Sequence, residues 1–266
     1  QVLRIIRDLK AAPIKALPLS GQTWYEIDDI QDLDIAEGMF APTDEAHFKA
    51  ISSRLGGYWR YPQMLDFCYL VNPYFPPQRM IDEIKASFET LMREYPSGMN
   101  VNTLLASKNF GVKQEFIAVG NGAAELIKAC MERHCRKLGN ILPTFEEYPN
   151  RLAPENVVQF TPQTPGYNYA AKDLTDFFDG KDIDTLLLIN PDNPSGNYIP
   201  FDDLLSLIEW TGRKGIMFIV DESFVDFAQV EGRTSLLDNG ILSANPNLTV
   251  VKSISKSYGV PGFRLG

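Results

Sequence analysis

Three short, largely apolar segments constrain the fold of this 266-residue chain more than any other feature. They are LLLIN at 186–190, IMFIV at 216–220 and LTVV at 248–251, and amphipathic helical patterns lie between them. Strands that are apolar on both faces are typical of a parallel sheet covered by helices on both sides. The pattern therefore predicts an α/β fold with three α/β/α layers around a mostly parallel central sheet.

The remaining sequence predicts flanking elements and a division of the chain. Apolar residues at helical spacing predict helices over 30–36, 44–55, 76–94, 101–110, 123–138 and 201–215. Extended runs predict further strands over 24–27, 65–73 and 115–119. Residues 1–45 resemble a separate piece, and the texture of the sequence changes from about residue 56. We predict a separate tail or linker over 1–42, and an N-terminal arm with a large domain over 43–266.

Composition excludes several classes of protein. Acidic residues outnumber basic ones by 34 to 25, whereas a nucleic-acid-binding protein normally carries a basic surplus. No apolar run approaches the roughly 20 residues that span a bilayer. The chain has three cysteines without metal-ligand spacing and two histidines, so we expect no metal site. Sparse cysteines indicate buried free thiols in a reducing, cytoplasmic compartment.

Polar residues follow each predicted strand, at the edge of a parallel sheet where ligands bind. Gly120 to Glu125 reads GNGAAE, and Pro191 to Gly196 reads PDNPSG. Asp221 and Glu222 follow the next strand, and the sequence SISK at 253–256 follows the last. Taken singly, each motif also fits an ordinary turn or helix cap. Together they predict one ligand site.

The chemistry of these residues fits one cofactor, pyridoxal 5'-phosphate. Lys256 can form a Schiff base with an aldehyde, and Asp221 can keep a pyridine nitrogen protonated. Asn193 can donate a hydrogen bond to a ring oxygen. Hydroxyl groups, the Arg264 guanidinium and the helix start near Gly122 can hold a phosphate. A nicotinamide-binding fingerprint is incomplete, because Glu125 stands where the third glycine is required.

The order of these motifs resembles the fold-type I pyridoxal-phosphate aminotransferases of class I/II, over about residues 56–266. GNGAAE, NPDNPSG, DES and SISK, with an arginine eight residues after the lysine, carry the resemblance. Within that superfamily, GGYWRYPQMLDFCYLVNPYFPP and SKSYGVPGFRLG are most similar to histidinol-phosphate aminotransferases and threonine-phosphate decarboxylases. The resemblance implies the PLP-dependent transferase-like large domain and a homodimer.

The resemblance also implies a role for each matching residue. Lys256 would carry the cofactor and move the substrate proton, while Asp221 pairs with the ring nitrogen. The other implied cofactor contacts are Gly122, Ala123, Ala124, Ser253, Ser255 and Arg264 at the phosphate, Asn193 at the ring oxygen, and Phe145 stacked on the ring. Tyr95 would reach the phosphate bound by the neighbouring subunit, and Asn72 would line the substrate pocket.

Two departures from the family pattern affect this interpretation. Phe224 stands where many relatives have a tyrosine that donates to the ring oxygen, and decarboxylase-like relatives tend to have phenylalanine there. The family also has a small C-terminal domain with an arginine that binds the substrate carboxylate, and residues 1–266 do not include it. We therefore expect a fragment that binds cofactor but transaminates weakly or not at all.

The first forty residues lie outside the aminotransferase pattern. WYEIDDIQDLDIAE resembles the tail of a sugar-phosphate or choline-phosphate nucleotidyltransferase, in which Asp28 would match an aspartate that helps to hold Mg²⁺. The alternative is a simple capped helix. The resemblance implies a fusion of two enzymes in a biosynthetic pathway that activates a small phospho- or phosphono-alcohol or amine for a cell-surface polymer.

The sequence thus predicts an aminotransferase acting between an amino acid or phosphorylated amine and a 2-oxo acid through a Lys256 Schiff base. Two alternatives stay open within the same fold: a decarboxylase of a phosphorylated amino acid and a catalytically incomplete fragment. A nicotinamide-dependent oxidoreductase is a further, disfavoured alternative. No nucleic-acid or membrane partner is expected.

Overall fold

The computed structural model describes residues 5, 18, 20–52, 65, 67 and 69–266. These fall into two compact units, residues 1–66 and 67–266. In the first unit, helix α2 (Ile30–Met39) packs against α3 (Asp44–Ser52). The second unit holds all the predicted cofactor residues, and the predicted division at residue 43 stays a prediction.

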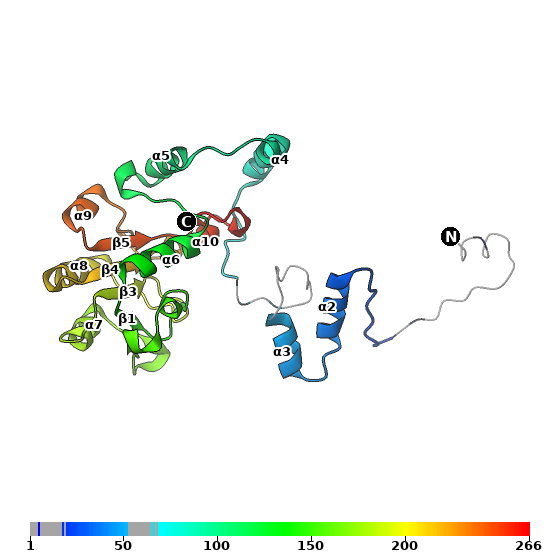
Figure 1. The fold of residues 1–266 in the computed structure, drawn as a ribbon, viewed down its shortest axis with the longest axis horizontal. Helices are drawn as coiled ribbons and strands as arrows, with labels where there is room; N and C mark the ends of the chain where they lie inside the picture. Colours follow the sequence, from blue (N-terminus) through cyan, green and yellow to red (C-terminus); the bar gives the residue numbers. More distant parts are fainter. Residues whose placement is uncertain (1–4, 6–17, 19, 53–64, 66, 68) are drawn as a thin grey trace. The chain divides into compact units, whose positions relative to one another are not determined.

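Five parallel strands form the centre of the second unit (Figure 1). They are β1 (Leu138–Ile141), β2 (Val157–Phe160), β3 (Thr185–Ile189), β4 (Met217–Asp221) and β5 (Leu248–Val251). Their order in the sheet is β2-β1-β3-β4-β5, and every pair is parallel. The predicted parallel sheet is therefore confirmed, and the strands predicted around 186–190, 216–220 and 248–251 are β3, β4 and β5.

Helices cover both faces of this sheet, as the apolar strands require. On one face α6 (Ala123–His134) buries Ile127 and Met131 against Leu187 of β3 and Ile219 of β4. On the other face, α7 (Ala171–Phe178) and α8 (Phe201–Lys214) pack on the neighbouring residues of the same strands. Because side chains alternate along a strand, Asp221 points to the α6 face, like Ile219. The three predicted layers are confirmed.

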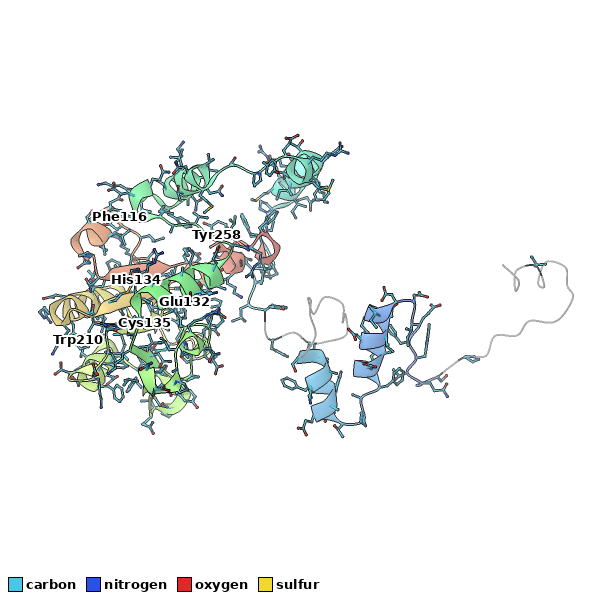
Figure 2. The ribbon with its side chains drawn as sticks, in the orientation of Figure 1. Phe116, Glu132, His134, Cys135, Trp210 and Tyr258 are labelled. Atoms are coloured by element: carbon cyan, nitrogen blue, oxygen red, sulfur yellow. The ribbon has the colours of Figure 1, made fainter. Side chains whose placement is uncertain are left out.

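The other described helices are α4 (Gln78–Arg93), α5 (Met99–Phe110), α9 (Asn239–Ala244) and α10 (Ile254–Ser257). Of these, α4 and α5 match the helices predicted over 76–94 and 101–110, with some boundaries moved, whereas α9 and α10 were not predicted. Short 3₁₀ turns occur at Gln114–Phe116, Pro149–Arg151, Pro154–Asn156, Pro165–Tyr167, Val225–Phe227 and Pro261–Phe263. Cys130 and Cys135 are free, Cys135 is buried at the end of α6 (Figure 2), and Cys68 lies outside the described residues.

Several predicted elements were wrong. The predicted helix over 123–138 ends at His134, because Leu138 already belongs to β1. The run 115–119 forms a 3₁₀ turn and an extended segment rather than a strand, since it lies across a cavity from β5 and pairs with no strand of the described sheet. The described residues of 24–27 and 65–73 form no strand either. β1 (LGNI) and β2 (VVQF) were missed because glycine or polar residues interrupt their apolar residues, so neither shows the continuous apolar run that marked β3 and β4.

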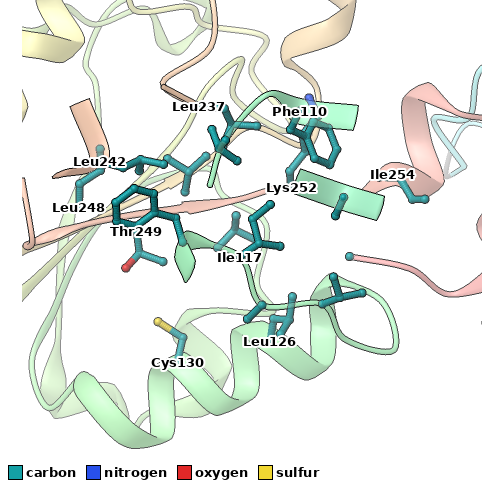
Figure 3. A pocket seen from close by; sticks show the side chains of 18 of the residues that line it. Phe110, Ile117, Leu126, Cys130, Leu237, Leu242, Leu248, Thr249, Lys252 and Ile254 are labelled. Carbon is teal, nitrogen blue, oxygen red and sulfur yellow. The ribbon is translucent and has the colours of Figure 1, made fainter. Parts of the chain in front are cut away.

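The cavity beside β5 encloses about 890 Å³ and has a mainly apolar lining. Figure 3 shows Ile117, Leu126, Leu242 and Leu248 among the side chains around it. It lies where β5, the last strand of the described sheet, faces the extended segment after Phe116. None of the predicted cofactor residues lines it, so this cavity is not the predicted site.

Asn140 is a polar side chain buried in the middle of β1. It is fully buried, and neither its amide nitrogen nor its amide oxygen has a hydrogen-bond partner among the described residues. A buried polar group without a partner loses its hydration and gains nothing in return. We expect Asn140→Leu to stabilise the chain against urea by about 1 kcal/mol.

Asn190 provides the matched control for this prediction. It is equally buried, but its amide donates to Ile199 O (3.0 Å) and accepts from Ile199 N (2.8 Å). Asn190→Leu is therefore expected to destabilise the chain by about 2 kcal/mol, because it leaves both backbone groups unpaired. Equal losses in the two variants would contradict the assignment of Asn140 as unpartnered.

Candidate functional site

Asp221 ends β4 and is 4% exposed. Its two carboxylate oxygens accept separate hydrogen bonds: Tyr148 Oη donates to Oδ2 (2.7 Å), and the Ser223 backbone N–H donates to Oδ1 (2.9 Å). Burial raises the pKa of Asp221, while hydrogen bonds from Ser223 and Tyr148 and the charge of Lys252 act in the opposite direction. The structure therefore holds a carboxylate in a fixed orientation at the carboxyl edge of the sheet.

Glu222, the neighbouring carboxylate, has a different environment. It is fully buried and accepts hydrogen bonds from Ser235 Oγ (2.6 Å) and the Leu236 backbone N–H (2.6 Å). Burial raises the pKa of Glu222, and these two hydrogen bonds oppose that shift. Glu222 is therefore used to anchor the chain around Leu236, and Asp221 is the carboxylate of this pair on the α6 face.

Lys256 lies in α10, directly after β5, and is partly buried. Ser253 caps this short helix, since its Oγ accepts from the Ser255 backbone N–H (3.3 Å). The Ser253 backbone N–H in turn donates to Ser223 Oγ (3.0 Å). Ser223 thereby joins the end of β4, where Asp221 lies, to the segment that carries Lys256.

Arg264 lies against the start of α6. A Cβ atom placed on Gly122 would come 3.2 Å from Arg264 Nη2, so the glycine leaves room for the guanidinium. Gly122 also has a positive φ of 76°, a conformation that glycine adopts without strain. The segment that follows Arg264 is held against the loop that contains Gly122, because Gly120 N donates a hydrogen bond to Gly266 O (3.0 Å). Gly122, Ala123, Ala124 and Arg264 are thus brought together, and no side chain caps α6.

Phe145 and Asn193 come from the loops after β1 and β3. Phe145 is 42% exposed, and its ring meets the ring of Tyr148 edge to face, with centroids 6.5 Å apart. Asn193 is partly buried in a turn whose neighbouring Asp192 accepts hydrogen bonds from Ser195. Its own side-chain amide makes no hydrogen bond within the described residues. Both side chains remain available to a ligand.

Asn72 contacts the lysine segment in a way that the sequence did not predict. Its backbone N–H donates to Lys256 O (2.9 Å), and its side-chain amide donates to Ser257 O (2.9 Å). Its side-chain oxygen accepts from the Tyr74 backbone N–H (2.9 Å). Asn72 therefore ties the segment before α4 to α10, and its role in a substrate pocket stays a prediction.

Tyr95, just beyond α4, is fully exposed on the described unit. The predicted contact with a neighbouring subunit stays a prediction. Tyr258, labelled in Figure 2, follows α10 and packs its ring edge to face on Phe75, with centroids 5.6 Å apart. This contact reinforces the connection that Asn72 makes.

Sequence reasoning missed Tyr148, Ser223 and Lys252. Lys252 Nζ pairs with Asp226 Oδ2 at 2.9 Å, and its side chain is only 9% exposed. The sequence feature that could have indicated Lys252 is a cation directly after a predicted buried strand, four residues before Lys256. Tyr148 lies 73 residues from Asp221 in the sequence, so no local pattern indicated their contact.

The residues present fit pyridoxal phosphate. A buried carboxylate with a fixed orientation suits a pyridine nitrogen, and the glycine beside Arg264 leaves a cradle that a side chain would fill. Lys256 and Arg264 take part in none of the ion pairs found among the described residues. Amine, carboxylate and phosphate-binding groups therefore occur on one set of loops.

In the first unit, the residues after Tyr25 form a capped helix start. Asp32 accepts hydrogen bonds from the backbone N–H groups of Asp28 (3.0 Å) and Asp29 (3.3 Å). Asp29 accepts one from Asp32 N (3.0 Å). This is the capped helix considered as the alternative for this segment, and a magnesium role for Asp28 stays a prediction. No described helix is long and apolar enough to cross a membrane.

Comparison with known proteins identifies relatives of both units. The CMP-5'-(3-aminopropyl)phosphonate synthase of Streptomyces rubellomurinus is 34% identical over 93% of this chain and 38% of its own length. The L-serine phosphate decarboxylase of Sulfurospirillum multivorans is 31% identical over 76% of this chain and 54% of its own length. The chain thus spans about half, or less, of these relatives.

Solved structures share the fold of the second unit. A decarboxylase from Sulfurospirillum multivorans matches with a TM-score of 0.64 and 30% identity, over 76% of this chain and 57% of its own. A histidinol-phosphate aminotransferase from Sinorhizobium meliloti, solved with pyridoxal-5'-phosphate, matches with a TM-score of 0.64 and 16% identity, over 81% and 60% of the two chains. The predicted fold is confirmed.

A family model identifies the family to which the chain belongs. The model described as aminotransferase class I and II matches residues 66–266, which include every predicted cofactor residue. The family and its cofactor, pyridoxal phosphate, are those predicted from the motifs at the strand ends. The chain belongs to the class I and II aminotransferase family.

Proposed function

We propose that this chain holds pyridoxal phosphate and is the cofactor-binding part of an enzyme that acts on an amino acid bearing a phosphate or phosphonate group. The observation that carries the proposal is the grouping of Lys256, the buried Asp221 and the Gly122–Arg264 cradle on adjoining loops. The cofactor, when bound, supplies an electron sink for a bond at the substrate Cα.

The chain's own residues have distinct parts in this proposal. Lys256 provides the amine that holds the cofactor aldehyde and afterwards moves a proton at the substrate Cα. Asp221 holds the proton on the ring nitrogen, and Asn193 donates to the ring oxygen. Phe145 covers one ring face. The phosphate is bound by Arg264, the hydroxyls of Ser253 and Ser255, and the backbone N–H groups that begin α6 at Gly122, Ala123 and Ala124.

Transamination is the reaction predicted from the sequence, and decarboxylation is the second candidate. The name of one relative, the L-serine phosphate decarboxylase of Sulfurospirillum multivorans at 31% identity, favours decarboxylation. Phe224, in the loop after β4, is the residue that the resemblance links to decarboxylases. Asp221 and Lys256 serve both reactions, because each begins by loosening a bond at Cα.

The names of the Streptomyces and Sulfurospirillum relatives support a substrate that bears a phosphate or phosphonate group. The extent of the Streptomyces alignment supports the predicted fusion with a nucleotidyltransferase. The alignment to the Streptomyces protein spans 93% of the chain, whereas the family model begins at residue 66. It therefore extends into the first unit, which carries the WYEIDDIQDLDIAE resemblance. We further propose that the protein is a homodimer and that it lies in the cytoplasm; light scattering tests the dimer.

The first experiment mixes the purified chain with pyridoxal phosphate, reduces it with borohydride and maps the adduct by mass spectrometry. We expect a visible absorbance band and an adduct on Lys256. The full-length protein is then given phosphoserine, with and without a 2-oxo acid. Release of CO₂ without an acceptor supports decarboxylation, whereas appearance of a 2-oxo product only with an acceptor supports transamination. An absence of adduct in both proteins overturns the proposal.

Arg264 provides a separate test of the phosphate site. Arg264→Ala removes a charge-assisted contact, so we expect the affinity for pyridoxal phosphate to fall by about 10- to 100-fold. Pyridoxal, which lacks the phosphate, should bind the variant and the original chain alike. Fluorescence titration measures both affinities. Equal losses for the two compounds would mean that Arg264 acts on folding and not on the phosphate.

A further inference from the structure

Tyr148 is a buried side chain that is not among the proposed cofactor contacts. It follows β1 and is fully buried, and its hydroxyl donates to Asp221 Oδ2 across 2.7 Å. Its aromatic ring meets Phe145 edge to face. One side chain therefore touches two residues that are predicted to contact different parts of the same ring.

The hydroxyl of Tyr148 controls how Asp221 is oriented. Ser223 N donates to the other carboxylate oxygen, so the two hydrogen bonds hold the plane of the carboxylate from both ends. Lys252 contributes its charge from the position just after strand β5, and its ammonium is paired with Asp226. Removal of the Tyr148 hydroxyl leaves one oxygen free to rotate away and takes a donor from a buried anion, which costs more than it would in water.

We propose that Tyr148 is a positioning residue: its hydroxyl orients Asp221 toward the cofactor nitrogen, and its ring supports Phe145 at the cofactor face. This inference rests on the proposed cofactor site. Because the hydroxyl and the ring have different proposed roles, two substitutions distinguish their effects. Tyr148→Phe keeps the ring and removes the hydroxyl, whereas Tyr148→Leu removes both.

The first test uses the chain without cofactor. We expect Tyr148→Phe to raise the pKa of Asp221 further, since the anion loses a donor, and carbon-13 NMR of the labelled carboxyl group follows that titration. Tyr169→Phe is the matched control, because Tyr169 is a buried tyrosine in the same unit that is not among the hydrogen-bond donors to Asp221. This variant should leave the Asp221 titration unchanged.

The second test uses cofactor labelled with nitrogen-15 in its ring. In Tyr148→Phe the proton should shift from the ring nitrogen toward Asp221, which moves the nitrogen resonance toward that of unprotonated pyridine. Affinity for the cofactor should fall by about tenfold in Tyr148→Phe and further in Tyr148→Leu, which also loses support for Phe145. Circular dichroism checks that each variant is folded.

The outcomes separate this inference from the proposed function. If the original chain takes up no cofactor, the proposed function fails, and the Asp221 titration still decides whether Tyr148 governs the carboxylate. An Asp221 titration in Tyr148→Phe that matches the original chain overturns the role of the hydroxyl. Equal cofactor affinities in Tyr148→Phe and Tyr148→Leu overturn the role of the ring.

Discussion

Replacing Lys256 with alanine is expected to abolish covalent capture of pyridoxal phosphate. The chain should show no absorbance band and no borohydride-stable adduct, because no other amine replaces the one on α10. If the full-length protein is active, its turnover should fall by about 10³-fold or more, since the group that moves the proton at Cα is also lost. Mass spectrometry of the reduced protein measures the adduct directly.

Lys252 is a neighbouring lysine that provides a control for the specificity of this experiment. It lies four residues earlier, just after β5, but its ammonium is paired with Asp226 at 2.9 Å. Lys252→Arg keeps the positive charge and should retain the adduct on Lys256. An adduct on Lys252 in the original chain, or its persistence in Lys256→Ala, would contradict the assignment.

The residues of the site were predictable where the chemistry lies at the end of a strand. Asp221 and Lys256 each follow a run of apolar residues whose burial can be inferred from the sequence alone, so their position at the sheet edge follows from the fold class. Arg264 was found through its spacing from the lysine, and its contact with Gly122 depends on a turn that only the structure reveals.

The parts that sequence reasoning missed depend on partners far away in the chain. β1 has the sequence LGNI, which lacks the apolar run that marked β3, and it is a strand because β2 and β3 flank it. The segment 115–119 has a strand-like sequence but pairs with no strand of the described sheet. Pairing decides whether a short apolar segment becomes a strand, and local pattern does not report pairing.

Gly259→Ala is expected to be the most disruptive single substitution near Lys256. A Cβ atom at Gly259 would lie 1.8 Å from Phe75 O and 2.7 Å from Asn72 O, and both are backbone atoms. The residue also has a φ of +59°, which disfavours alanine. The two segments must therefore separate, at a cost of about 2–4 kcal/mol.

Separation of these segments would release the lysine from its support. The hydrogen bond from Asn72 N to Lys256 O, 2.9 Å in length, should open, and exchange of the Asn72 amide proton should accelerate by about 100-fold or more. Capture of pyridoxal phosphate by Lys256 should slow in parallel. Hydrogen exchange read by mass spectrometry or NMR measures the first effect, and stopped-flow absorbance measures the second.

Gly262→Ala is the matched control for this prediction, three residues further along the same loop. A Cβ atom at Gly262 would meet nothing within 4 Å, so we expect amide exchange at Asn72 and the rate of cofactor capture to stay unchanged. If Gly259→Ala behaved like Gly262→Ala, the contact between Asn72–Phe75 and the lysine loop would not support the site. If both variants lost capture, flexibility of the whole loop would matter rather than the close approach of two backbones at Gly259.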